Sequence, residues 1–235
     1  MKQPGQKATG RRPLVVAFDV NETLFDLASL ANVFNTFELP PHALPWWFAT
    51  VLRDGMALTA AGDSAVFAEL ADVALEEVAT SCGRPLAENA PEVLLKAFGE
   101  LPAHPDVRPA LAMLGSVGVR ALALTNGNSR TTAALLERAG VRNLVADDLS
   151  ADEVGHWKPR SEPYRHAADR AGVPPDAVAL VAAHPWDVHG AIRAGLIGGW
   201  ANRTGRPFPS VFAEPHVQGD SLVAVVEALL ALPER

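Results

Sequence analysis

An acidic residue ends the first strongly apolar stretch of the sequence. Residues 14–18 are five consecutive apolar residues, and Asp19 follows them directly. Such a run is typical of a parallel strand that is buried on both faces. Because ligands of open α/β sheets bind just beyond the carboxyl ends of the strands, Asp19 is a candidate catalytic carboxylate. The structural alternative is that Asp19 only caps the helix that follows.

Further polar groups follow two later predicted strands. A Thr-Asn-Gly segment, residues 125–127, comes after the strand expected at 119–124, and a His-Pro-Trp-Asp segment, residues 184–187, comes after the strand expected at 177–182. Lys158, one of four lysines against sixteen arginines, lies on a loop between strands. A carboxylate nucleophile needs a cation that keeps it ionised, a polar group that orients it and often a second acid that activates water. These residue types therefore predict a site built around a nucleophilic carboxylate.

The elements that position these residues alternate between strand and helix, except in one segment. Between residues 27 and 103 only helical periodicity is found, whereas a strand-helix alternation resumes after it. The patterns predict a doubly wound, parallel α/β core formed by residues 13–26 and 104–235, interrupted by an all-helical cap, residues 27–103. Further strands are expected near 144–145 and at 197–201, and a loop without regular structure is expected at 203–219.

Composition and charge narrow the classes of partner. The 235 residues carry a net charge of -7 and a single cysteine, Cys82. With no apolar run of about 18 residues and no signal-peptide pattern, we expect a cytoplasmic protein without disulfides and without a membrane partner. An acidic chain without basic clusters also makes a nucleic-acid partner unfavourable, so a small-molecule substrate is expected. Residues 1 to about 12 are expected to form a loose tail.

Four ordered motifs resemble those of the haloacid dehalogenase superfamily. They are Asp-x-x-x-Thr-Leu at 19–24, Thr-Asn-Gly at 125–127, Lys-Pro at 158–159 and Trp-Asp at 186–187. The position of Tyr164 and of the cap makes the chain most similar to the L-2-haloacid dehalogenase branch. The resemblance implies a modified Rossmann core, a homodimer and a reaction without a metal or another cofactor. That reaction is an SN2 attack on the α-carbon of a small carboxylic acid, which gives an aspartyl ester and then a 2-hydroxy acid.

The resemblance also implies roles for individual residues. Asp19 is the nucleophile, and Lys158 keeps it ionised. Thr23 and Asn126 orient the carboxylate or the ester, and Asp187 helps to activate water. The backbone amides that follow Asp19 are expected to bind the substrate carboxylate at the strand-to-helix turn. The expected substrate-binding residues are Val20, Asn21, Glu22, Trp47, Phe48, Thr125, Tyr164, His184 and Trp186.

Two positions depart from the phosphatases of the same superfamily. Those enzymes carry a second Asp two residues after the nucleophile, where this chain has Asn21. They also carry paired acids in the last motif, and the earlier acid falls near Ala183. An amide does not donate a proton to a leaving oxygen, and a hard divalent cation loses part of its oxygen ligands. A Mg²⁺-dependent phosphatase is kept as an alternative hypothesis.

Other positions depart from the dehalogenases themselves. Phe48 stands where the family has the Arg that receives the departing halide, and a phenyl ring offers no donor to an anion. Arg53, on the same predicted helix, is the candidate replacement. Glu22 replaces a Gly of the family and His184 an Asn; together with Asn21 and Phe48 they suit an amine leaving group. Such a site resembles the related hydrolases that open the ring of azetidine-2-carboxylate through the same ester. An inactive member that binds a small acid or a protein is the non-enzymatic alternative, against which the retained charged residues argue.

Overall fold

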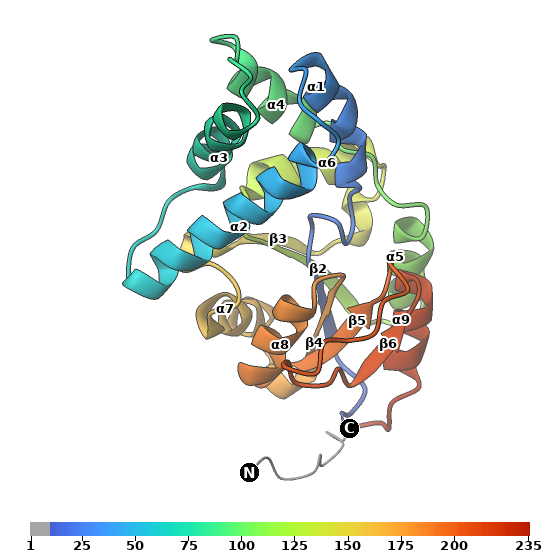
Figure 1. The fold of residues 1–235 in the computed structure, drawn as a ribbon. Coiled ribbons are helices and arrows are strands. Elements are labelled where there is room, and N and C mark those ends of the chain that lie inside the picture. Colours follow the sequence, from blue (N-terminus) through green and yellow to red (C-terminus); the bar gives the residue numbers. More distant parts are fainter. Residues whose placement is uncertain (1–9) are drawn as a thin grey trace.

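Six parallel strands form one sheet in the computed structural model, which describes residues 10–235 (Figure 1). In the order β3-β2-β1-β4-β5-β6, β1 lies inside the sheet, and the order reverses direction between β1 and β4. This is the doubly wound arrangement, whose ligand crevice lies at the carboxyl ends of the two strands where the order reverses. The predicted fold class is confirmed, while the expected tail falls mostly outside the described residues. The strands are β1 (Val15–Phe18), β2 (Arg120–Thr125), β3 (Asp147–Ser150), β4 (Val178–Ala182), β5 (Ile197–Ala201) and β6 (Val217–Gly219).

The residues of β1 alternate between two buried layers. Val16 and Phe18 belong to one apolar cluster, and Val15 and Ala17 belong to the other. None of the four side chains is exposed, which explains why the strand is a continuous apolar run in the sequence. The first face is covered by α5 (Val107–Ser116), α6 (Ser129–Arg138) and α9 (Leu222–Leu230), and the second by α7 (Ser161–Ala171) and α8 (Pro185–Arg193).

Between β1 and α5 the chain forms helices and no strand of the sheet, and all of residues 27–103 are described. Figure 1 shows these helices together on one side of the sheet, above it in the view. The chain leaves the α/β core and returns to it at one place. There Asp26 N donates to Pro102 O and His104 N donates to Leu24 O, both at 2.9 Å. Their apolar residues join the cluster of the first sheet face without a break. The elements are a 3₁₀ turn (Leu27–Leu30), α1 (Ala31–Thr36), α2 (Ala43–Ala61), α3 (Phe67–Ser81) and α4 (Ala90–Phe98).

Two strand predictions are wrong. The strand expected near 144–145 lies at Asp147–Ser150, and Arg142–Leu144 form a 3₁₀ turn before it. The segment 203–219, expected to be irregular, ends in β6. Both strands lie at the edges of the sheet and pair on one side only. An edge strand needs no continuous apolar run, so the sequence pattern did not mark either of them.

The loop that precedes Lys158 packs tightly against the helical segment. Trp157 N donates to Thr59 Oγ1 at 3.1 Å, and Trp157 Nε1 donates to Ala65 O at 3.2 Å. The indole stacks on Phe67 with ring centroids 6.3 Å apart. Gly55 of α2 leaves room for this ring, since a Cβ at that position would overlap it. The helices therefore fix the backbone next to Lys158.

We predict that Gly55→Ala destabilises the protein by about 1–3 kcal/mol, because the added methyl group forces Trp157 out of its position. The matched control is Gly115→Ala near the end of α5, where a Cβ would meet no atom within 4 Å. The control is expected to be neutral or to stabilise by up to about 1 kcal/mol. The free energy of unfolding in urea measures both, and equal effects would contradict the predicted role of Gly55.

Candidate active site

A buried ammonium group lies between two carboxylates at the carboxyl ends of the strands. Lys158 Nζ contacts Asp19 Oδ1 at 2.8 Å and Asp187 Oδ2 at 2.7 Å, and it donates to Leu124 O at 2.9 Å. Lys158 and Asp187 are 0% exposed, and Asp19 is 5% exposed. All three ammonium donors are thus used inside the protein. The structure brings together the three charged residues that the sequence analysis placed in one site.

The second oxygen of Asp19 is held from the other side. Thr23 Oγ1 donates to Asp19 Oδ2 at 2.7 Å and accepts from Ala183 N at 2.9 Å. His184 Nδ1 lies 3.3 Å from the same oxygen. Since Thr23 follows β1 and residues 183–184 follow β4, the carboxylate is fixed at the point where the sheet order reverses.

The charges around Asp19 keep it ionised. Burial would raise the pKa of this carboxyl, but Lys158 and His184 outweigh burial and hold the pKa far below its ordinary value. Burial would lower the pKa of Lys158, yet Asp187 and Asp19 raise that pKa above its ordinary value. At neutral pH, Asp19 is therefore a carboxylate suited to nucleophilic attack and not a proton donor.

Asp187 contacts the Lys158 ammonium group and is itself held by Tyr164. Its Oδ1 accepts from the Tyr164 hydroxyl at 2.6 Å, and its Oδ2 is taken by Lys158. Burial, followed by the nearby charge of Asp19, raises the pKa of Asp187. Asp187 and Tyr164 are both fully buried. The expected geometry, with Asp187 activating water and Tyr164 contacting substrate, differs from the observed one, in which Asp187 contacts Lys158 and Tyr164 contacts Asp187.

His184 links the nucleophile to a second carboxylate. Its Nε2 lies 2.7 Å from Glu22 Oε2. The imidazole stacks on Trp186 with ring centroids 5.3 Å apart, and Phe48 lies 6.1 Å from it on the helical side. Burial opposes a charge on the ring, but hydrogen bonds to Asp19 and Glu22 raise the pKa of His184 to about 10. The resting site therefore holds an imidazolium between two carboxylates.

Glu22 reaches His184 from an unusual backbone conformation. Its φ is 62°, in the left-handed region that costs a residue other than glycine about 1–2 kcal/mol. Its N–H donates to Phe25 O at 2.8 Å, so this amide is not free for a substrate carboxylate, contrary to expectation. The amides of Val20 and Asn21 keep that predicted role.

The polar residues after β2 hold the loop of Lys158. Asn126 Oδ1 accepts from Lys158 N at 2.8 Å, and Asn126 Nδ2 donates to Lys158 O at 3.3 Å. Asn126 therefore clamps the lysine backbone and does not touch the carboxylate that it was expected to orient. Thr125 Oγ1 accepts from Gly127 N at 2.8 Å, which closes the turn beside the site.

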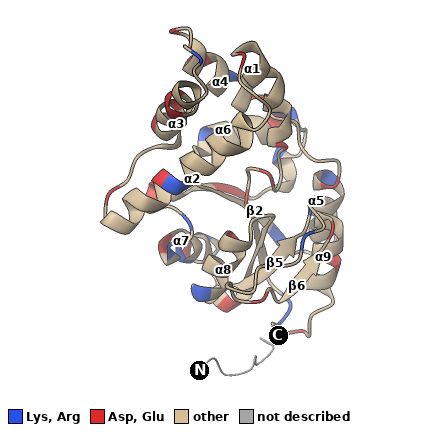
Figure 2. Cartoon of the chain, viewed as in Figure 1, with Lys and Arg blue, Asp and Glu red and all other residues tan. Residues whose placement is uncertain are grey.

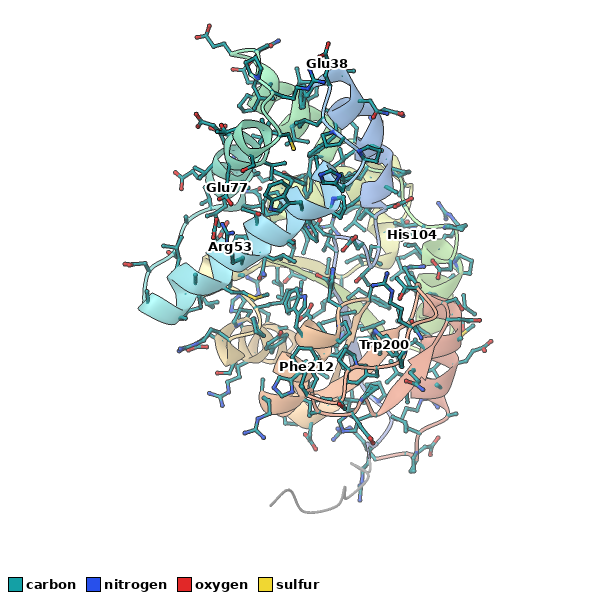
Figure 3. All side chains as sticks on the ribbon, in the orientation of Figure 1. Glu38, Arg53, Glu77, His104, Trp200 and Phe212 are labelled. Carbon is teal, nitrogen blue, oxygen red and sulfur yellow. The ribbon has the colours of Figure 1, made fainter. Side chains whose placement is uncertain are left out.

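Two pockets are bordered by residues that follow Asp19 in the chain or contact it. The first, about 320 Å³, is bordered by apolar residues of α3 and α4 and by residues after β1, β2 and β3, several of them polar: Phe67, Leu95, Phe98, Val20, Asn21, Thr125, Asn128, Thr131, Thr132 and Asp152 among them. The second, about 430 Å³, lies on the side of His184 and Glu22 and is also bordered by Asp26, His104, Ala183, Trp200, Arg203 and Arg206; His104 and Trp200 are labelled in Figure 3. Val20 and Asn21, which follow Asp19 in the chain, border the first pocket, and His184, which contacts Asp19, borders the second.

Two residues of α2 do not reach the site. Arg53 pairs with Asp54 Oδ1 at 2.7 Å and with Glu77 Oε2 at 3.0 Å, and Figure 3 shows Arg53 on α2 next to Glu77 on α3. Arg53 therefore does not replace the missing halide-binding Arg. Trp47 is fully buried and donates from Nε1 to Ala71 O at 2.9 Å. It packs inside the helical segment, so the expectation that it contacts substrate is wrong.

Arg203 is a site residue that the sequence analysis missed. Its Nη2 donates to Thr23 O at 2.6 Å, and its guanidinium pairs with both oxygens of Asp106 at 3.0 and 3.2 Å. Asp106 Oδ2 in turn accepts from Leu222 N at 2.7 Å. Arg203 thus ties the turn after Asp19 to the core. Nothing in a segment rich in Pro and Gly marks it for this role.

The described chain as a whole adds three findings on charge, metal ligands and hydropathy. Figure 2 shows acidic and basic positions interspersed over the helices of the described chain. Within residues 10–235, no group of three or more His, Cys, Asp or Glu is arranged to hold a metal ion. No helix of that range combines the length and the apolar character that a membrane crossing requires.

Fold and site together define a doubly wound α/β enzyme with a lysine-held carboxylate where the strand order reverses. The family model of the haloacid dehalogenase-like hydrolases matches residues 14–195. The chain belongs to this family of enzymes, in its L-2-haloacid dehalogenase-like branch.

Individual relatives agree with this assignment. (S)-2-haloacid dehalogenase 1 of Pseudomonas sp. (strain CBS-3) is 30% identical over 219 residues, 92% of this chain and 96% of that protein. (S)-2-haloacid dehalogenase 4A of Burkholderia cepacia is 36% identical over 129 residues, 55% of this chain and 56% of that protein. The crystal structure of an L-2-haloacid dehalogenase has a TM-score of 0.88 at 26% identity, covering 95% of this chain and 100% of that one. The crystal structure of a dehalogenase with an intermediate complex has a TM-score of 0.84 at 28% identity, covering 96% and 99%.

We predict that His184 makes the stability of the protein depend on pH. Its pKa of about 10 in the folded protein exceeds the ordinary value of 6.5, so the folded state binds the proton more tightly. The stabilisation is therefore complete below pH 6.5 and is lost as the pH rises through about 10. We expect the urea midpoint to fall between about pH 7 and about pH 10, and to fall less in His184→Asn. Parallel curves for the two proteins would contradict the charged state of His184.

Proposed function

We propose that this protein is a hydrolase in which Asp19 attacks the α-carbon of a small 2-substituted carboxylic acid. The attack displaces the 2-substituent and forms an aspartyl ester, and water then hydrolyses the ester to a 2-hydroxy acid. The observation that carries the proposal is the 2.8 Å ion pair between Lys158 Nζ and Asp19 Oδ1, which keeps the nucleophile charged and fixed. Relatives that are named (S)-2-haloacid dehalogenases support this type of reaction.

The proposed substrate site is the pocket of about 320 Å³, with residues 27–103 acting as the cap that closes it. Phe67, Leu95 and Phe98 of this segment border the pocket opposite Val20 and Asn21. A pocket of about 320 Å³ suits an acid of a few carbon atoms, and polar side chains on its border, such as Asn21 and Thr125, can orient that acid. The homodimer, the cytoplasmic location and the absence of a cofactor stay predictions.

The leaving group is proposed from the charges of the site. A departing halide needs a donor, but Phe48 offers none and Arg53 is engaged by Glu77. Lys158 and His184 carry two positive charges and contact three carboxylates. The site therefore has no surplus of positive charge for a departing anion. This balance favours, as a second candidate, a substrate whose leaving group is an amine, such as azetidine-2-carboxylate. The haloacid remains the candidate that the relatives favour.

The residues of the site do not fit the Mg²⁺ of the superfamily phosphatases. Asn21 and Ala183 supply no carboxylate where those enzymes have acids. Both oxygens of Asp187 are occupied by Lys158 and Tyr164. A hard cation prefers several oxygen ligands, and the described residues contain no group of three or more His, Cys, Asp or Glu arranged to hold one. No step of the proposed reaction therefore uses a metal.

We predict that Asp19→Asn lowers turnover by at least about 1000-fold, because an amide is a poor nucleophile. The assay offers L-2-chloropropionate, azetidine-2-carboxylate and p-nitrophenyl phosphate in parallel, with and without EDTA. A single turnover of the wild-type protein in ¹⁸O water is expected to place ¹⁸O in the Asp19 peptide, as mass spectrometry detects. An unlabelled Asp19 peptide together with EDTA-sensitive phosphate release would reject the ester mechanism.

We predict that Phe48→Arg changes the preference for the leaving group. A guanidinium beside His184 stabilises a departing halide and repels a departing amine, so the ratio of haloacid to azetidine turnover is expected to rise about tenfold or more. Phe48→Leu is the matched control, since it removes the ring without adding a donor. The two kcat/KM values of each variant give the ratio, and equal ratios in Phe48→Arg and Phe48→Leu would refute the prediction.

A further inference from the structure

Hydrolysis of an ester on Asp19 needs a base beside the carboxyl carbon, and Asp187 is not placed to supply it. Both side-chain oxygens of Asp187 accept hydrogen bonds, from Lys158 at 2.7 Å and from Tyr164 at 2.6 Å. At the other oxygen of the nucleophile, His184 Nδ1 lies 3.3 Å from Asp19 Oδ2. His184 also borders the pocket of about 430 Å³. It is thus a titratable group that touches the reacting carboxylate and meets a route for water.

We propose that His184 is the catalytic base of ester hydrolysis and that Glu22 is its positioning residue. The inference rests on the proposed function, because it presupposes an ester on Asp19. Neutral His184 accepts a proton at Nδ1 as the oxygen of a water molecule attacks the carboxyl carbon of Asp19. The bond between that carbon and the ester oxygen breaks, and His184 passes the proton to the departing oxygen, which releases the 2-hydroxy acid. The remaining water proton leaves the new carboxyl group for His184, so the carboxylate and the imidazolium are both restored.

Formation of the ester itself prepares this base. In the resting site the imidazolium is held by two carboxylates, Asp19 at 3.3 Å and Glu22 at 2.7 Å. Ester formation turns the first of them into a neutral group, which removes one of the charges that raise the pKa of His184. The proton then leaves to solvent or to a basic leaving group. His184 is therefore protonated while Asp19 attacks and neutral when water must be activated.

Glu22 has the geometry of the group that orients a catalytic base. Its carboxylate accepts from Nε2, so the proton that His184 keeps is on Nε2 and the lone pair of Nδ1 faces Asp19. The same division of roles, in which an acid fixes the tautomer and ring orientation of a histidine, operates in hydrolytic triads. Trp186, stacked on the imidazole at 5.3 Å, holds the plane of the ring. Glu22 makes this contact from a left-handed backbone conformation, φ 62°.

The pocket beside the dyad is suited to hold the water. The other charged or titratable groups that border it are Asp26, His104, Arg203 and Arg206. Burial, then Arg203, lowers the pKa of His104, so this ring adds no charge. Within the described part of the chain, His104 Nε2 and Arg203 Nε are buried without a protein partner. Buried polar atoms of this kind bind ordered water.

The test is a single turnover with bromoacetate, whose leaving group needs no proton, followed by intact-protein and peptide mass spectrometry. In the wild-type protein the ester on Asp19 is expected to form and to decay. In His184→Asn it is expected to form and to persist, with decay about 100-fold slower. His184→Gln is the second variant, and circular dichroism shows which variants are folded. His42→Asn, on the exposed start of α2, is the matched control with the wild-type decay rate.

The outcomes separate this inference from the function on which it rests. An ester that decays at the wild-type rate in both His184 variants overturns the role of His184 and leaves the ester mechanism standing. An ester found in the wild-type protein but never in the His184 variants assigns the residue to the first step and also overturns the inference. Absence of any ester and of any product in the wild-type protein, both with bromoacetate and with azetidine-2-carboxylate, overturns the proposed function itself.

Glu22→Gln distinguishes positioning from a structural role. In the wild-type protein the rate of ester decay is expected to rise with pH as His184 becomes neutral. Without the Glu22 carboxylate the pKa of His184 falls, so the midpoint of this rise is expected to move down by about one pH unit. A variant whose rate is lower at every pH, with an unmoved midpoint, would show that Glu22 only supports the fold.

Discussion

The structure depends on holding one ammonium group in the protein interior. Transfer of such an ion out of water costs several kcal/mol, and only close, fully bonded partners offset the cost. Lys158 finds them in Asp19, Asp187 and the carbonyl of Leu124, all within 2.9 Å. These acceptors belong to segments that are far apart in the chain and meet only when β1, β2 and β4 lie side by side in register. The ammonium group can therefore be held in the interior only when the sheet is assembled.

The interior of the sheet could be predicted from the sequence because burial on two faces leaves a simple pattern. β1 and β4 are short apolar runs, and the polar residues that end them had to meet once the strands were parallel. The edges could not be predicted in the same way. β3 begins with two aspartates, and β6 has only three residues. Both are edge strands, which are stabilised by backbone hydrogen bonds and need no continuous run of apolar side chains.

Within the site, the sequence identified the charged residues better than their partners. Motif spacing located Asp19, Lys158 and Asp187, but which side chain saturates which oxygen depends on three-dimensional packing. Trp47 and Phe48 show the limit: neighbours on a helix point about 100° apart, and only the packing of α2 decides that Trp47 enters the helical core while Phe48 faces His184. The contacts of Trp157 and Arg203 span 98 and 180 residues of sequence, and no local pattern records them.

Charge balance connects the resting site to the proposed cycle. Asp19, Lys158, Asp187 and His184 are all buried or nearly so, and with an imidazolium their formal charges sum to zero; Glu22, with 45% of its side chain exposed, adds its charge where water screens it. If an ester removed the charge of Asp19 while His184 stayed protonated, one buried positive charge would lack a partner. Loss of the His184 proton restores the balance, leaving the Lys158–Asp187 pair intact. In this proposed cycle, a buried unpaired charge is costly because the interior has a low dielectric constant. Ester formation therefore favours loss of the His184 proton, and no movement of the backbone is required.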